Sequence, residues 1–130
     1  MSNKEHFTTR SRNRETKTVE GRFYPQGTGA VVNGSNVGRG FTVTRTGVGV
    51  FDIDFEEAYV DFLDFEGTPN MATGVNHVRV TAQKRNSQNA LTGLTITNFS
   101  NAAAAVDIAA AATSFISFSA VMSDTLLPKV

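Results

Sequence analysis

The sequence predicts an all-β protein, an antiparallel β-sandwich or jelly roll with an extended N-terminal arm. Apolar and polar residues alternate with a period of two in several segments, which is the pattern of half-buried strands. Gly, Pro and Asn separate these segments at short intervals, as turns do. The 130 residues include no cysteine, so the core must be held by packing alone.

About seven or eight short strands are expected. The first covers 19–24 and is closed by Pro25. A short strand over 30–32 follows, and Asn33-Gly34 is expected to form a turn.

A hairpin over 41–55 is the most distinct feature of the sequence, with its turn expected at Thr46-Gly47. One face carries Phe41, Val43, Arg45, Phe51, Ile53 and Phe55, and the other carries Thr42, Thr44, Asp52, Asp54 and Glu56. Successive strand residues face opposite sides, so this pattern predicts two antiparallel strands with one face in water.

The later strands are expected over 60–65, 77–84, 91–99 and 113–122. We expect Gly67–Asn70 to break the first of them, because Pro69 cannot donate to a central ladder. In the last strand, Phe115 should lie on one face and Ile116 and Phe118 on the other.

The segment 101–112 contains eight alanines and disagrees with an all-β chain. Alanine is the strongest helix former, and Asn101 is a suitable cap, so a short helix is one expectation. An irregular or strand-like connection is the other, because alanine also fits where another backbone approaches closely.

The charges suggest an N-terminal arm over 1–18 and a β domain over 19–130. The arm has five basic residues against two acidic ones, and the segment 51–66 has seven acidic residues and no basic one. The basic residues are Lys4, Arg10, Arg12, Arg14 and Lys17. A basic end and an acidic middle in a chain of zero net charge suit pairing with a neighbouring molecule, and nucleic acid is not an expected partner.

Three interpretations of the arm remain open: an acidic protein partner, an idle solvated tail, or phosphate binding. Arg10, Arg12 and Arg14 alternate, so in an extended chain they project to one side. This favours a strand-like arm laid along a protein partner, within a reach of roughly 50–60 Å. No apolar run approaches the ~20 residues of a membrane span, and the first residues do not resemble a secretory signal.

No catalytic, cofactor or metal site is expected. A calcium site or a glycosidase pair formed by Asp52, Asp54, Glu56 and Glu57 is disfavoured, because strand alternation places carboxylates in a row rather than around an ion. His6 and His77 are the two histidines, and no Gly-x-Ser-x-Gly motif accompanies them. Gly27, Gly29, Gly47 and Gly49 are expected to be turn glycines with positive φ rather than phosphate loops.

The run Phe41-x-Val43-x-Arg45-x-Gly47-x-Gly49-x-Phe51-x-Ile53-x-Phe55 resembles the central hairpin of C1q/TNF-like jelly-roll domains, especially those of bacteriophage virion proteins. Val78–Ala82, Thr92–Ile96, Asp107 and Phe115-x-x-Phe118 follow the order of later strands in that family. The Ala-rich stretch is longer than the family's connection, and the absence of a stalk before the domain favours a compact surface trimer over a stalked tip.

The resemblance implies a homotrimer that binds a major capsid protein. The expected function is therefore that of a head-decoration (cement) protein on the outer surface of the virion, assembled in the host cytoplasm. Phe51, Phe55, Phe115 and Phe118 are expected in the core or at a subunit interface, which the sequence does not separate. The alternative function is a receptor- or glycan-binding tail or fibre module, and a carboxylate enzyme that uses Asp52 or Asp54 is a third class.

Overall fold

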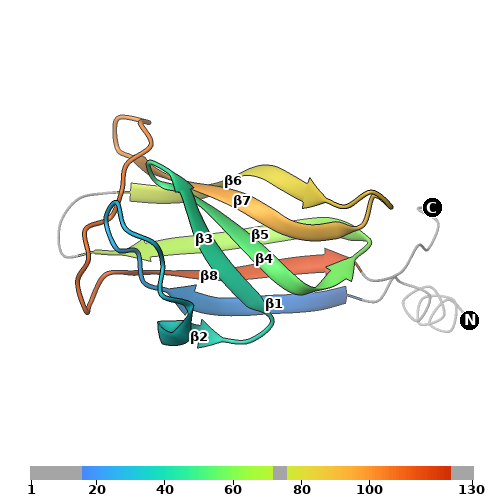
Figure 1. Cartoon of the computed structure of the whole chain (residues 1–130). Helices are drawn as coiled ribbons and strands as arrows, with labels where there is room; N and C mark the ends of the chain where they lie inside the picture. Colours follow the sequence, from blue (N-terminus) through green and yellow to red (C-terminus); the bar gives the residue numbers. More distant parts are fainter. Residues whose placement is uncertain (1–15, 72–75, 124–130) are drawn as a thin grey trace, which may run out of the picture.

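The computed structural model, which describes residues 16–71 and 76–123, is a sandwich of two four-stranded antiparallel sheets. One sheet has the order β2-β1-β8-β5 and the other β3-β4-β7-β6 (Figure 1). The strands are β1 (Thr16–Phe23), β2 (Val37–Gly38), β3 (Phe41–Gly47), β4 (Val50–Tyr59), β5 (Asp61–Asn70), β6 (Asn76–Arg85), β7 (Leu91–Ser100) and β8 (Phe115–Ser123). The predicted all-β sandwich is confirmed.

The hairpin of β3 and β4 is confirmed, with Val43 opposite Ile53 and Thr44 opposite Asp52. Val43 and Ile53 are almost completely buried, whereas Thr44 is exposed, so the predicted alternation of faces is correct. The pairing register shifts near the end of β3, where a bulge interrupts the ladder.

The turn of this hairpin lies two residues later than predicted, at Val48-Gly49 rather than at Thr46-Gly47. Gly49 has a φ of 68°, which favours glycine, and a Cβ there would lie 2.5 Å from the carbonyl oxygen of Val106. Positive φ was therefore predicted correctly for Gly49 and Gly27 but wrongly for Gly47 and Gly29.

The short strand predicted over 30–32 is wrong, because this segment has no ladder partner. A single 3₁₀ turn, η1 (Asn33–Ser35), follows it and stands in place of the predicted β-turn. The side chain of Asn33 donates to the carbonyl of Val43 at 3.1 Å and accepts from its N–H at 2.8 Å. The amide of Asn33 thus bonds to the backbone of β3 as a residue of a neighbouring strand would, and it holds η1 against β3.

The predicted break at 67–70 is also wrong, because β5 continues through Pro69 to Asn70. Pro69 lies opposite Ile116 of β8. β5 is the last strand of its sheet, and an edge strand tolerates a proline that a central strand does not. The other later strands, β6, β7 and β8, agree with the predicted ranges to within two residues.

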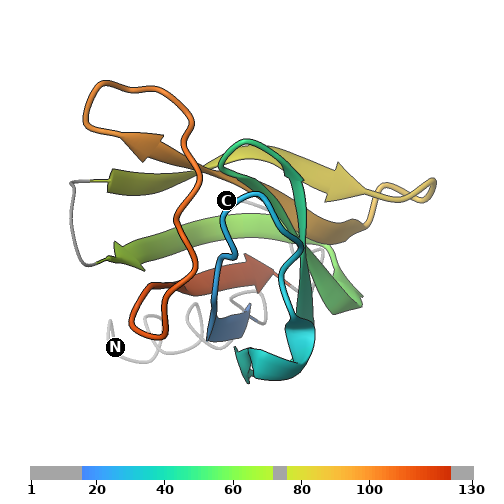
Figure 2. The ribbon, with the colours of Figure 1, turned by 60° about the vertical axis from the view of Figure 1, so that its left-hand side comes forward.

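The Ala-rich segment forms no helix and crosses irregularly from β7 to β8 along one end of the sandwich (orange in Figure 2). Ile108 is 3% exposed and anchors the connection in the core. Most of the alanines remain exposed. Anchoring by Ile108 and by polar contacts described below overrides the helix propensity of alanine.

The first strand, β1, begins at Thr16, three residues before the strand predicted over 19–24. Thr16 pairs with Ser123, and Lys17 pairs with Met122. Residues 16–18 therefore belong to β1.

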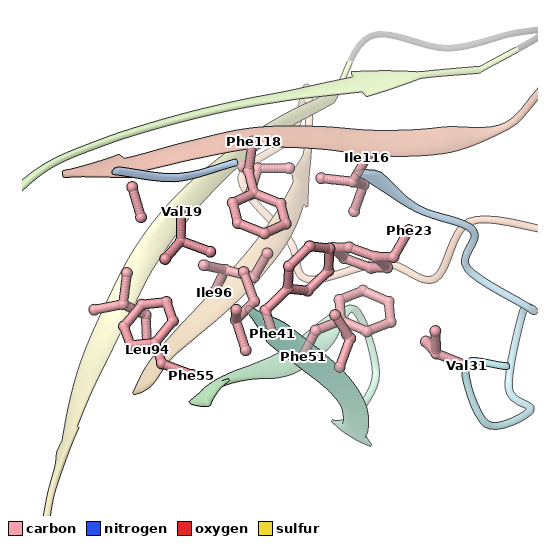
Figure 3. Close-up of a cluster of buried hydrophobic side chains, with 14 of the residues drawn as sticks. Val19, Phe23, Val31, Phe41, Phe51, Phe55, Leu94, Ile96, Ile116 and Phe118 are labelled. Carbon is pink, nitrogen blue, oxygen red and sulfur yellow. The ribbon is translucent and has the colours of Figure 1, made fainter. Parts of the chain in front are cut away.

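The core lies between the inner faces of the two sheets (Figure 3). It contains Phe51, which is 0% exposed, and Phe118, which is 5% exposed. Phe55 is also in the core, where its ring meets Tyr59 edge-on. Phe115 is different: it alternates with core residues of β8, contacts Tyr24 and lies under the guanidinium of Arg22. Three of the four aromatic residues assigned to core or interface are thus core residues.

Candidate functional site

The acidic block of the sequence, 51–66, is divided between the two sheets. Alternation along β4 places Asp52 and Asp54 on the outer face of the β3-β4-β7-β6 sheet. Alternation along β5 places Asp64 and Glu66 on the outer face of the other sheet. The two sets of carboxylates have different surroundings.

Asp52 and Asp54 are engaged by Lys84 of β6. Its Nζ lies 2.5 Å from the Oδ1 of Asp54 and 3.4 Å from the Oδ2 of Asp52. The hydroxyl of Thr95 donates to Asp52 at 2.8 Å. The hydrogen bond to Asp54 raises the pKa of Lys84. These carboxylates hold three strands together across the sheet, which is a structural role.

A calcium site of Asp52, Asp54, Glu56 and Glu57 is not assembled. Glu56 and Glu57 are exposed beyond the Asp52–Asp54 row. Among residues 16–71 and 76–123, no group of three or more His, Asp or Glu side chains is close enough to hold a metal ion.

The second set forms what we call the carboxylate face, Glu20, Asp64 and Glu66 on the outer side of the β2-β1-β8-β5 sheet. Glu66 and Glu20 lie on either side of Ser119 in the paired register. All three carboxylates are exposed, and none takes part in an ion pair with another described residue. No other described residue therefore neutralises these three carboxylates by an ion pair.

A groove of about 280 Å³ lies beside this face, between the edge strands β5 and β6, which Figure 1 shows on the same side of the sandwich. Polar and apolar groups share its lining, which is formed by the apolar residues Phe62, Leu63, Phe65, Val78 and Val80 and by the charged residues Asp64 and Arg79. Leu63 lies at a bulge of β5 and is 40% exposed. Apolar surface thus continues outward from the core at this edge.

A polar junction fixes the opposite end of the hairpin. The guanidinium of Arg45 donates to both carboxylate oxygens of Asp107, at 3.0 and 2.9 Å, and the N–H of Gly49 donates to the same carboxylate at 2.8 Å. The hydrogen bonds from Arg45 lower the pKa of Asp107, and Gly49 adds to this effect. This junction holds the Ala-rich connection against the hairpin turn.

A shallow hollow of about 590 Å³ lies near the end of the sandwich beside this connection. It is lined by Tyr24, Gln26 and Ser35 and by the alanines at 110–112. The side chain of Gln26 donates to the carbonyl of Tyr24 at 3.1 Å. The hollow presents an aromatic residue and hydrogen-bonding groups to solvent.

The basic residues assigned to partner binding are mostly outside the described residues: Lys4, Arg10, Arg12 and Arg14. Lys17 is exposed at the start of β1. His6 is also outside, and His77 stacks on the ring of Phe99 with centroids 5.5 Å apart.

No family model matches this chain, and neither a curated protein nor a solved structure matches it. In the part of the chain that the structure describes, no helix has the length and apolar character needed to cross a bilayer.

Reasoning from the sequence missed the carboxylate face as a unit and the groove next to it. Period-two alternation places Asp64 and Glu66 on one face of β5, but that strand was expected to end at Phe65. The neighbouring Glu20 is 46 positions away from Glu66, so only the strand order brings the two together.

Proposed function

We propose that this chain is a virion structural protein, a head-decoration (cement) protein that binds the outer surface of a phage capsid. It is a non-enzymatic protein, its partner is the major capsid protein, and it acts as a homotrimer. The proposal rests on the hairpin resemblance and on the way in which the described residues use their charges.

The observation that carries the proposal is the separation of charge between the N-terminal segment and the body. Lys84 and Arg45 are committed to ion pairs within the body. The three carboxylates of the carboxylate face have no such partner among the described residues. The net positive segment 1–15 precedes β1 directly. Complementary surfaces of this kind orient one molecule on another.

The mechanism is non-covalent clamping. The N-terminal segment extends across adjoining capsid subunits and pairs through Arg10, Arg12 and Arg14 with acidic surface. The sandwich buries apolar area against its neighbours, and each Å² of apolar surface removed from water contributes about 25 cal/mol. The area buried under the extended N-terminal segment and under the sandwich together supplies most of the affinity, and the arginines fix the register, so the sandwich alone does not bind.

Co-sedimentation with shells assembled from a major capsid protein of the same source tests this function. The full chain should bind in many copies per shell, and removal of residues 1–15 should abolish binding while leaving β1 complete. Binding by the truncated chain at full stoichiometry would contradict the proposal. Circular dichroism of the truncated chain checks that the sandwich is intact.

The alternative, a receptor- or glycan-binding tail module, is favoured by the hollow at Tyr24, Gln26 and Ser35. Aromatic and amide groups are suited to the face and the hydroxyls of a sugar ring. In this case a glycan array should give a hit that is lost in Gln26→Ala and kept after removal of residues 1–15. A decoration protein should give no hit on the glycan array. Its binding to capsid shells should be kept in Gln26→Ala and lost on removal of residues 1–15.

A third class, a carboxylate enzyme, would have to use Asp52 or Asp54. Both are engaged by Lys84, so their replacement by asparagine should affect stability and no other property. An activity lost in Asp52→Asn would support the enzyme instead.

A further inference from the structure

We propose that the free edge of β5 binds the N-terminal segment, residues 1–15, of a second copy of this chain as an added strand. This contact between copies goes beyond the proposed function, because it is the contact that free chains make with each other in solution, and it does not depend on a capsid being the target. It would link the molecules to each other.

The edge is free among the described residues. β5 is the last strand of its sheet and pairs only with β8, and β6 is the last strand of the other sheet. An edge strand presents N–H and C=O groups that have no partner, and an extended peptide can pair with them. The groove between β5 and β6 leaves room for the inward side chains of such a strand.

The exposed carboxylates of β5 are opposite in charge to the arginines of the segment and have the same spacing. Asp64 and Glu66 are exposed on the outer face of β5, two positions apart. Two positions along a strand correspond to roughly 6.5–7 Å. Arg10, Arg12 and Arg14 repeat at the same interval. An added strand can therefore place successive arginines beside successive carboxylates.

The other face of the same segment suits the groove. Phe7, Thr9 and Ser11 are at odd positions, so in an extended chain they face away from the arginines. The groove is lined by apolar side chains such as Phe65 and Val80. Phe7 supplies an aromatic ring for this surface, and the small side chains of Thr9 and Ser11 fit a narrow space.

The same edge discourages other strands. Asp64 and Glu66 would repel the β5 edge of a second copy, the bulge at Leu63 interrupts its regular ladder, and Pro69 offers no N–H. A basic segment is not repelled by these carboxylates, so the edge favours the N-terminal segment over the β5 edge of a second copy.

A second copy fits better than the segment of the same molecule. β1 begins at Thr16, opposite Ser123, and Ser123 is opposite Asp61 of β5. To reach the far side of β5, the molecule's own segment must cross about three strand spacings, roughly 14 Å. This crossing uses about four residues and takes Arg12 and Arg14 out of register. The segment of a second copy does not have to make this crossing, so its Arg12 and Arg14 stay in register. Such a head-to-tail contact between copies can close into a ring.

Mixing two single-cysteine variants tests the proposal directly, because the chain has no cysteine of its own. Ser11→Cys in one preparation and Leu63→Cys in another should give a disulfide-linked heterodimer on mild oxidation, since this bond needs Cα atoms within about 7 Å. Thr42→Cys, which is exposed on β3, replaces Leu63→Cys as the matched control and should give none. A yield no higher than that of the control would overturn the proposal.

Charge reversal supplies the second arm. Asp64→Lys with Glu66→Lys should weaken association of the full chain about tenfold, and mixing with Arg12→Glu, Arg14→Glu chains should restore it. Reversal of Glu56 and Glu57, which are exposed outside the groove, should leave association unchanged. Equal effects of the two reversals would overturn the proposal. So would a Ser11→Cys, Leu63→Cys double variant that cross-links only within a monomer.

Discussion

At the scale of single residues, ion pairs and buried side chains fix the parts of the chain that have no regular structure. Arg45 and Asp107 are 62 positions apart in the sequence and meet in a two-pronged ion pair. Asn98, which is 1% exposed, donates from its side chain to the carbonyl of Val106 at 2.9 Å. These contacts tie the Ala-rich connection to β3 and β7.

Asp107→Asn should lower stability in a pH-dependent way. Arg45 holds the pKa of Asp107 below its ordinary value of 3.8, so the folded state favours the carboxylate. The stabilisation is complete above that value and is lost as the pH falls through the lower pKa of the folded state. Urea unfolding should therefore separate the variant from the natural chain at neutral pH and bring the two together well below pH 3.8. A difference that did not change with pH would contradict the role of this charge.

Leu94→Ala should cost about 2–5 kcal/mol of the free energy of unfolding. Leu94 is 0% exposed in the core, so its replacement leaves a cavity between the sheets. The control is Thr42→Ala on the exposed face of β3, which should change stability by less than about 0.5 kcal/mol. Denaturant unfolding measures both values, and equal losses would contradict the assignment of faces.

At the scale of elements, the strands were largely predictable and their ends were not. The hairpin over 41–55 was predictable because one face of each strand is largely apolar and the other is polar. This local pattern does not depend on what the strands pack against. The turn lies at Val48-Gly49, where the Ala-rich connection packs against it. This contact joins segments far apart in the sequence, so the local pattern did not indicate it. Long-range structure also decides two other outcomes. Pro69 is tolerated because β5 is an edge strand, and the alanines of 101–112 form no helix because Ile108 anchors the segment in the core.

Gly49→Ala should destabilise the hairpin turn by about 1–3 kcal/mol. The backbone there has a φ of 68°, and the added Cβ would meet the backbone of Val106. Gly34→Ala is the matched control, because a Cβ at Gly34 has no atom within 4 Å. Thermal unfolding of the two variants compares them directly. A loss in Gly34→Ala as large as that in Gly49→Ala would show that close approach at the turn is unimportant.

At the scale of the whole molecule, charge is arranged so that the body neutralises part of its own acid and leaves the rest exposed. Lys84 forms ion pairs with Asp52 and Asp54, and Arg85 forms one with Asp61. Asp64 and Glu66 remain on the outer surface next to the groove between β5 and β6. The sequence showed the excess of acid, but only the strand order shows which carboxylates stay available.

Association through exposed charges must weaken with salt. The Debye length falls from about 10 Å at 0.1 M to about 3 Å at 1 M ionic strength. The dissociation constant of the full chain should therefore rise with salt, and Arg10→Gln with Arg12→Gln should remove most of that dependence. Light scattering across a salt series measures both effects. An association constant that is insensitive to salt would mean that apolar burial alone drives the contact.

The central claim is that this chain works by association through its basic N-terminal segment. Sedimentation equilibrium of the full chain and of the chain from Thr16 onward, each at low salt, tests it most directly. The account predicts an oligomer for the full chain and a folded monomer for the shortened one. Identical masses for the two chains would contradict it.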